Sequence, residues 1–160
     1  MGKRNFSQEE KKKESFLRVA NALYSHWRVT DFNDKEKLAC GGHSRLFEVL
    51  IPDAYIIAGE SLAGREYREH VVPINLIRNH AYHMFNNGYL IEDVANMIEN
   101  NLYIILITTK ERDILDKSVE VGGKGWKYDM PDEWKFGDDA FARLNQADIK
   151  FKLYKDVNVK

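Results

Sequence analysis

Cysteine is nearly absent from this sequence, in which Cys40 is the single example. One cysteine excludes an internal disulfide and a cysteine-rich zinc module. Long hydrophobic runs are also absent, since no apolar stretch approaches the roughly 20 residues that span a bilayer. The charged N-terminal segment lacks the apolar core of a signal peptide. These absences predict a soluble protein of the cytoplasm with no membrane partner.

Neither sign of charge is in excess, because 24 basic and 25 acidic residues leave a net charge of −1. The total therefore does not indicate a nucleic-acid-binding protein, although a local basic face would be enough for one. A length of 160 residues, with 44% hydrophobic and 12% aromatic residues, is typical of a folded chain with its own core. We therefore predict a single domain over residues 1–160.

The periodic segments predict an α+β fold. Ser7 and Glu10 form a capping box ahead of an amphipathic helix at about 8–28. Pro73 and the run Asn86–Gly88 mark the start and end of another helix, the first of a helical pair. The other predicted elements are a polar connection at about 30–43, a small antiparallel sheet with strands at 45–52, 54–59, 65–72 and 102–107, and helices at 91–100, 110–118 and 140–146, the last within an irregular Trp-containing segment at about 122–160.

Three of the five histidines lie between Tyr67 and Phe85, and His70 stands at the expected end of a strand. A histidine titrates near neutrality and can take a proton from water, as hydrolysis of a phosphodiester requires. That reaction also needs a divalent cation to stabilise negative charge, and Mg²⁺ prefers carboxylate and amide oxygens. Glu69 is adjacent, but alternation along a strand points the two side chains to opposite faces unless the strand ends or twists before Pro73.

The run Glu69-His70-Val71-Val72-Pro73 resembles the first signature of the HNH branch of the His-Me finger (ββα-metal) nucleases. In that family a later Asn begins a strand, and Asn101 stands in that place. The third element of the family is a metal-binding residue on the following helix, for which this chain offers Glu111, with Asp113 as a substitute. The resemblance covers about 65–118 and implies a divergent member of the superfamily, with a helical insertion in the finger.

The resemblance implies a metal-dependent endonuclease that hydrolyses phosphodiester bonds with Mg²⁺ or Mn²⁺, acting on DNA rather than RNA. His70 would be the general base and Asn101 its orienting or phosphate-side partner, while Glu69 and Glu111 would be the metal ligands. Arginines near the finger would contact phosphates through their planar guanidinium groups. These arginines are Arg65, Arg68, Arg78 and Arg112. Plentiful Asn, Lys and Ile would also suit an AT-rich phage or mobile element.

Two other functions fit the same residues. A degenerate finger would give a non-catalytic binding or inhibitor protein with a nucleic-acid or protein partner, as the missing third His or Asn and the near-zero net charge allow. A homodimeric structural module would use its histidines only to satisfy a polar interface. Metal-linked stabilisation separates the nuclease from the degenerate finger.

Several of these side chains also have structural interpretations. His70 could be a hydrogen-bonded structural histidine, and the arginines near it could belong to an exposed strand face of alternating charge. His80 and His83 could share a metal on one helix, but they fit boundary and surface positions better. Trp126 and Trp134 could stack on bases or close a small core around a proline turn.

Overall fold

The computed structural model describes residues 4–30 and 45–155 of the chain. Most of the predicted polar connection, including Cys40, lies outside the described residues, because it falls within positions 31–44. The combination of helices with a four-stranded sheet confirms the predicted α+β class. Within the described part of the chain, no helix combines the length and the apolar character that crossing a bilayer needs.

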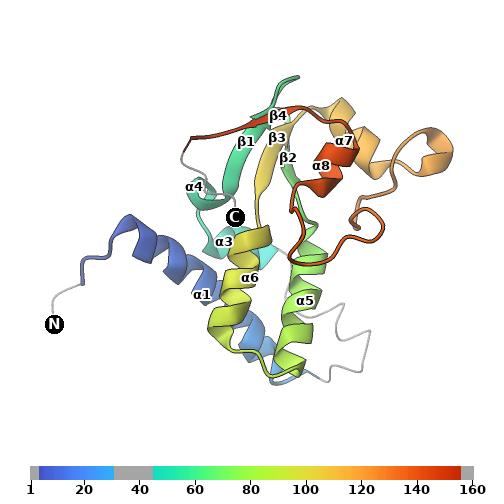
Figure 1. Ribbon diagram of the computed structural model, residues 1–160. Coiled ribbons are helices and arrows are strands. Elements are labelled where there is room, and N and C mark those ends of the chain that lie inside the picture. The colour runs from blue at the N-terminus through green and yellow to red at the C-terminus, as the bar shows by residue number, and fades with distance from the viewer. Residues whose placement is uncertain (1–3, 31–44, 156–160) are drawn as a thin grey trace. The chain divides into compact units, whose positions relative to one another are not determined.

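The chain divides into two compact units, each built from two separate stretches of sequence (Figure 1). We call them the helical unit and the sheet unit after their main elements. The helical unit comprises Met1–Tyr55 and Arg78–Glu99, and the sheet unit comprises Ile56–Ile77 and Asn100–Lys160. The residues predicted to act in catalysis or metal binding all belong to the sheet unit.

Helix α1 (Gln8–Trp27) of the helical unit confirms the predicted N-terminal helix and its capping box. The Ser7 hydroxyl accepts a hydrogen bond from the Glu10 N–H (3.1 Å), and the Glu10 carboxylate accepts one from the Ser7 N–H (2.8 Å). Two N–H groups that the first helical turn leaves unpaired are thereby satisfied. The apolar face of the helix is buried, as its spacing predicts, through Phe16, Val19, Ala20 and Leu23.

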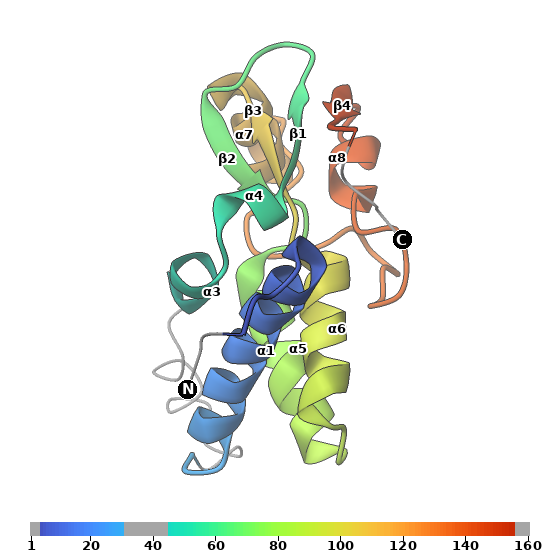
Figure 2. The same cartoon turned by 90° about the vertical axis from the view of Figure 1, so that its left-hand side faces the viewer.

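Helices α5 (Ile74–Asn86) and α6 (Ile91–Asn101) form the predicted helical pair. Pro73 directly precedes α5. At the N-terminus of a helix the backbone N–H groups have no partner within the helix, so the missing N–H of proline removes no hydrogen bond there. Gly88 follows α5 with a φ of 78°, a left-handed conformation that glycine adopts without strain. Figure 2 shows α1, α5 and α6 side by side, and the Phe85 ring of α5 contacts aromatic rings of α1. These contacts join α1 to α5 within the helical unit.

Two segments predicted as strands are helical at least in part, which corrects the sequence interpretation. The first is α3 (Arg45–Leu50), and the second begins as α4 (Asp53–Ile56) before its strand starts. A short apolar run cannot be assigned to a strand or a helix by its periodicity alone. Here the fully buried pair Phe47 and Ile51 has the four-residue spacing of one helical face.

The sheet has four strands in the order β2-β3-β1-β4 (Figure 1). The strands are β1 (Ile57–Ser61), β2 (Tyr67–His70), β3 (Ile104–Ile107) and β4 (Phe151–Leu153). Strands β2 and β3 are antiparallel, as are β1 and β4, but β1 and β3 are parallel, which corrects the prediction of a purely antiparallel sheet. Since β1 and β2 run in opposite directions, the strand between them must be parallel to one of the two.

Helix α7 (Thr109–Asp116) follows β3, so that β2, β3 and α7 succeed one another in ββα order. Helices α5 and α6 come between β2 and β3, where the sequence predicted a helical insertion. Helix α8 (Ala142–Gln146) forms the predicted short helix of the C-terminal segment. The Phe141 ring before α8 stacks between Tyr103 (5.6 Å) and Phe151 (5.4 Å), which fastens this segment to the sheet.

Candidate functional site

Glu69 and His70 are the last two residues of β2 and both pair in register with β3. The pairing continues beyond them, because the Val71 N–H donates to the Tyr103 carbonyl (3.0 Å). Successive side chains of a regular strand point to opposite faces of the sheet. The strand therefore does not end or twist early enough to bring the two side chains together. Glu69 is buried, whereas His70 is half-buried.

The Glu69 carboxylate forms an ion pair with Arg143 of α8, whose side chain is only 1% exposed. One nitrogen of the guanidinium, Nη2, donates to Glu69 Oε1 and to the His70 carbonyl. The other, Nη1, donates to the Trp126 carbonyl (2.6 Å). A buried guanidinium needs such partners, because an uncompensated charge is costly in a protein interior. This one side chain joins α8, β2 and the segment around Trp126.

Burial is the largest influence on the pKa of the Glu69 carboxyl, and it raises that pKa above its ordinary value. The guanidinium of Arg143 acts next most strongly, in the opposite direction. The negative charge of Asp116 on α7 raises the pKa further, and the positive charge of Arg112 lowers it. The ionised form of Glu69 therefore depends on Arg143 for its stability in this environment.

Arg143 is a residue of the site that the sequence interpretation missed, although the sequence contains a signal for it. In a helix over 140–146, Arg143 falls on the same face as Ala140 and Leu144. A cation on an apolar face has to find a buried acid or leave its charge unpaired. That reasoning would have predicted a buried ion pair for this arginine, but not that Glu69 is the partner.

Glu111 closes a second capping box, at the N-terminus of α7. Its Oε2 accepts hydrogen bonds from the Thr108 N–H (2.8 Å) and the Thr108 hydroxyl (2.9 Å). Its Oε1 accepts a third from the Ser61 hydroxyl at the end of β1 (2.6 Å). Oε2 thus caps the start of α7, while Oε1 joins that helix end to β1 of the sheet.

The carboxylates predicted to bind Mg²⁺ all have partners within the protein. The charge of Glu69 is matched by the buried guanidinium, and both oxygens of Glu111 accept hydrogen bonds. Asp113, the predicted substitute, forms ion pairs with Arg112 (2.9 Å) and Lys117 (3.1 Å). Among the residues that the structure describes, no group of three or more His, Cys, Asp or Glu side chains could hold a metal ion.

Asn101 is buried and is the last residue of α6. The family pattern expects this Asn to begin a strand, but β3 begins only at Ile104. The Asn101 carbonyl accepts a hydrogen bond from the Tyr103 N–H (3.2 Å), within a tight connection from helix to strand. Because His70 pairs with Ile104, the connection from Asn101 to β3 lies next to the end of β2 that carries His70.

The arginines predicted to contact phosphate are divided between the two units. Arg78 is in the helical unit, where it donates to the side-chain oxygen of Asn79 (3.2 Å). The other three are in the sheet unit: Arg65, Arg68 and Arg112. Arg112 lies 5.0 Å from the centroid of the Tyr67 ring, a cation–π geometry. Arg65 is 72% exposed and forms a long ion pair with a carboxylate on β1 (3.5 Å).

His80 and His83 lie on α5 in the helical unit, with their rings stacked 6.1 Å apart. His80 is half-buried and His83 is exposed, so the boundary and surface positions predicted for them are confirmed. Burial lowers the pKa of His80, and the neighbouring His83 lowers it further. Neither belongs to the unit that carries His70.

Trp134 has the structural role that was one of its two predicted alternatives. Its indole N–H donates to the Asp139 carbonyl (2.9 Å), and its ring meets Phe136 edge-on (5.0 Å). These contacts close a small turn core, as aromatic residues around a proline turn commonly do. Trp126 has a different environment, beside two exposed lysines.

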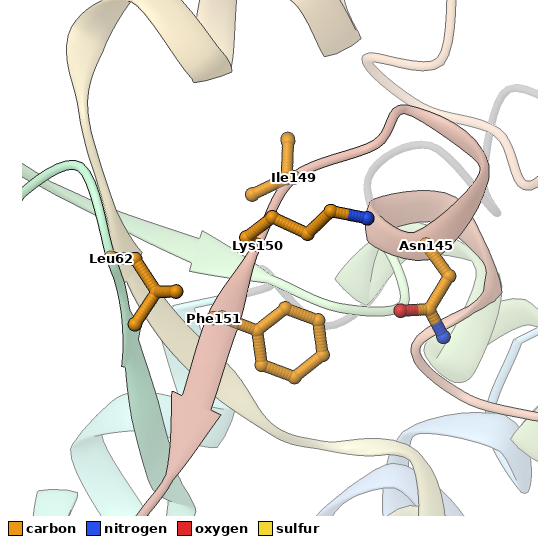
Figure 3. Close-up of a pocket in the computed structure, with 5 residues that line it drawn as sticks. All are labelled: Leu62, Asn145, Ile149, Lys150 and Phe151. Atoms are coloured by element: carbon orange, nitrogen blue, oxygen red, sulfur yellow. The ribbon is translucent and has the colours of Figure 1, made fainter.

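A small pocket of about 270 Å³ lies in the sheet unit beside α8 and the edge strand β4 (Figure 3). Its lining residues are Leu62, Asn145, Ile149, Lys150 and Phe151. The volume is below the range of roughly 300–1,000 Å³ that is usual for small-molecule sites. The lining shares no residue with the predicted catalytic or metal-binding set, so this pocket adds nothing to the chemistry of His70.

Comparisons with known proteins give this chain no relative: no family model, no curated protein and no solved structure matches it. The resemblance to the HNH branch therefore stays a prediction from the sequence motifs.

Proposed function

We propose that this protein binds nucleic acid without cleaving it, on the ββα arrangement of β2, β3 and α7. The observation that carries the proposal is the buried ion pair between Glu69 and Arg143. The resemblance assigns Glu69 to a metal site, but here its carboxylate has a guanidinium as its cation. The elements β2, β3 and α7 follow the ββα order that the resemblance implies, while Glu69 and Glu111 form contacts that stabilise the fold.

The energetics oppose exchange of Arg143 for a divalent cation. A metal that took the Glu69 carboxylate would leave the guanidinium unpaired in the interior. Breaking a buried ion pair on one side typically costs about 3–5 kcal/mol, which would weaken metal binding by a factor of roughly one hundred to several thousand. Glu111 offers no easier route, since its two oxygens hold Ser61 and Thr108.

The second candidate is the metal-dependent nuclease, and a specific observation favours it as well. His70 stands at the end of the first strand of a ββα unit, the place that the resemblance gives to the general base. Asn101 adjoins the same strand end and would orient the histidine or the substrate phosphate. In this candidate, the metal ligands would have to differ from Glu69 and Glu111.

Cleavage of supercoiled plasmid separates the two candidates. The proposal predicts no nicking by the purified chain with Mg²⁺, with Mn²⁺ or with EDTA, and no rise of Tm as either metal is added. His70→Ala would then be indistinguishable from wild type in the cleavage assay. Metal-dependent nicking that disappears in His70→Ala would refute the proposal and support the nuclease.

A further inference from the structure

A short segment of the sheet unit alternates lysines with aromatic rings on the protein surface. We call this segment, Lys124-Gly-Trp-Lys-Tyr128, the basic-aromatic segment. The Lys124 ammonium lies 5.5 Å from the centroid of the Trp126 ring, and the Lys127 ammonium lies 5.3 Å from that of Tyr128. Tyr128 is 60% exposed, both lysines are exposed, and Trp126 is half-buried. Positive charge and flat apolar surface therefore occur together.

The backbone of the basic-aromatic segment is fixed although its side chains face solvent. A 3₁₀ turn, η1 (Val119–Val121), leads into it after α7. Three N–H groups of the segment, those of Lys124, Gly125 and Trp126, then donate to carbonyls in the last turns of α7 and just after it, at 2.7–2.8 Å. Gly123 allows this close approach, because a Cβ there would lie 2.0 Å from the Lys117 carbonyl oxygen. The rings and ammonium groups are thus presented from a fixed base.

Two further contacts tie the segment to the neighbourhood of His70. The Tyr128 carbonyl accepts a hydrogen bond from the Asn75 side chain at the start of α5 (3.2 Å). The Trp126 carbonyl accepts one from Arg143, the side chain that also donates to the His70 carbonyl. One buried guanidinium therefore holds both the segment and the strand end that the resemblance makes functional.

We infer that the basic-aromatic segment is a contact surface for single-stranded nucleic acid. Tyr128 and Trp126 would stack on bases, and Lys124 and Lys127 would meet the flanking phosphates. A single strand is the ligand that offers both groups at once, because the bases of a duplex are already stacked and hide their faces. The flanking Glu120 and Asp129 reduce the local positive charge, so the stacking contribution should be the larger one.

This inference rests on the proposed function and names the ligand and the surface. It is tested with the full chain and fluorescent oligonucleotides of about 15 nucleotides, near the upper end of the roughly 4–16 nucleotides that single-strand sites cover. Single-stranded DNA, single-stranded RNA and a DNA duplex of the same sequence are titrated in EDTA, so that cleavage cannot occur. We expect both single strands to bind more tightly than the duplex. A duplex bound as tightly as the single strands would overturn the inference.

Substitutions in the segment separate stacking from charge. Tyr128→Ala should weaken single-strand binding about tenfold, while Tyr128→Phe, which keeps the ring, should bind like wild type. Lys127→Gln should reduce the slope of log affinity against log salt by about 0.7, the value for one phosphate contact on a single strand. The matched control is Tyr89→Ala, a tyrosine of the helical unit that is 54% exposed. It should leave binding unchanged.

The outcomes distinguish this inference from the proposed function. If wild type binds and Tyr128→Ala binds equally well with an unchanged Tm, the segment is not the contact surface and the proposed function stands. If wild type binds none of the three oligonucleotides, both fall. If Tyr128→Ala and Tyr89→Ala weaken binding alike, the effect does not belong to the segment and the inference is refuted.

Discussion

Glu10 in the helical unit and Glu111 in the sheet unit hold the same position in the same capping motif. Each carboxylate accepts a hydrogen bond from the N–H of the residue that caps its helix. The additional partner differs. Glu10 reaches Arg4, which is 72% exposed and close in the sequence, whereas Glu111 accepts a hydrogen bond from Ser61 on another element.

The comparison shows that a local motif does not fix the role of its residues. At α1 the capping box ends one helix and little else depends on it. At α7 the capping box also contacts the sheet, because the Ser61 hydroxyl at the end of β1 donates a hydrogen bond to Glu111. The residue type alone would leave the Glu111 carboxylate available for a ligand, but in the structure its oxygens accept hydrogen bonds within the fold. Glu69 repeats this lesson more strongly, with a fully buried arginine as its partner.

The largest expected effect is that of Arg143→Met. The variant removes the cation and leaves the Glu69 carboxylate buried without its partner, so the free energy of unfolding should fall by about 3–5 kcal/mol. Urea unfolding followed by tryptophan fluorescence measures the loss. Because Trp27 is in the helical unit and both Trp126 and Trp134 are in the sheet unit, Trp27→Phe reports on the sheet unit and the double variant Trp126→Phe/Trp134→Phe reports on the helical unit. A single domain, as predicted from the length, would give coincident transitions.

The control for this prediction is the double variant Glu69→Leu/Arg143→Met. Replacing a whole buried ion pair by apolar residues is often neutral or stabilising, so the double variant should be more stable than Arg143→Met alone. A single variant as stable as wild type would mean that the ion pair contributes nothing to the sheet unit. It would also remove the main argument against a metal at Glu69.

The second effect separates the two capping boxes. Glu111→Ala leaves the Ser61 hydroxyl and the Thr108 N–H without their acceptor, and should cost about 1–3 kcal/mol in the free energy of unfolding. Glu10→Ala is the matched control and should cost less, since its partners are exposed and can bind water. In a double-mutant cycle, Ser61→Ala should couple to Glu111→Ala and not to Glu10→Ala. Equal losses in the two variants would contradict the comparison.

The helices and their ends could be predicted from the sequence wherever the signals are local. Ser7, Pro73 and Gly88 each act within one turn of chain, and the structure places helix ends at all three. The segment at 45–50 failed because a short apolar run fits a helix and a strand equally well. The parallel pairing of β1 with β3 could not be predicted from the sequence, because it arises from the position of β3 between β2 and β1 in the sheet.

Only those features of the candidate site that depend on residues close together in the sequence could be predicted. The alternation rule separated Glu69 from His70 correctly, given a regular strand. The motif Thr108-x-x-Glu111 was readable as a capping box, and would have predicted that Glu111 is engaged. The pairing of Glu69 with Arg143 was not readable, because it joins segments far apart in the chain.

The smallest expected effect concerns pH, and it distinguishes buried from exposed carboxylates by sign. Burial raises the pKa of Glu69 in the folded state, so its ionisation should reduce stability as pH rises from the ordinary carboxyl range through that raised pKa. The hydrogen bonds from Ser7 lower the pKa of Glu10, so its contribution should be lost as pH falls through that lowered pKa. The stability advantage of wild type over Glu69→Gln should therefore shrink toward neutral pH, while that over Glu10→Gln should shrink toward acid pH. Urea unfolding across the acid range measures both. Differences that change in the same direction would show that Arg143 outweighs the burial of Glu69, since a carboxyl whose pKa is lowered by its partner would behave like Glu10.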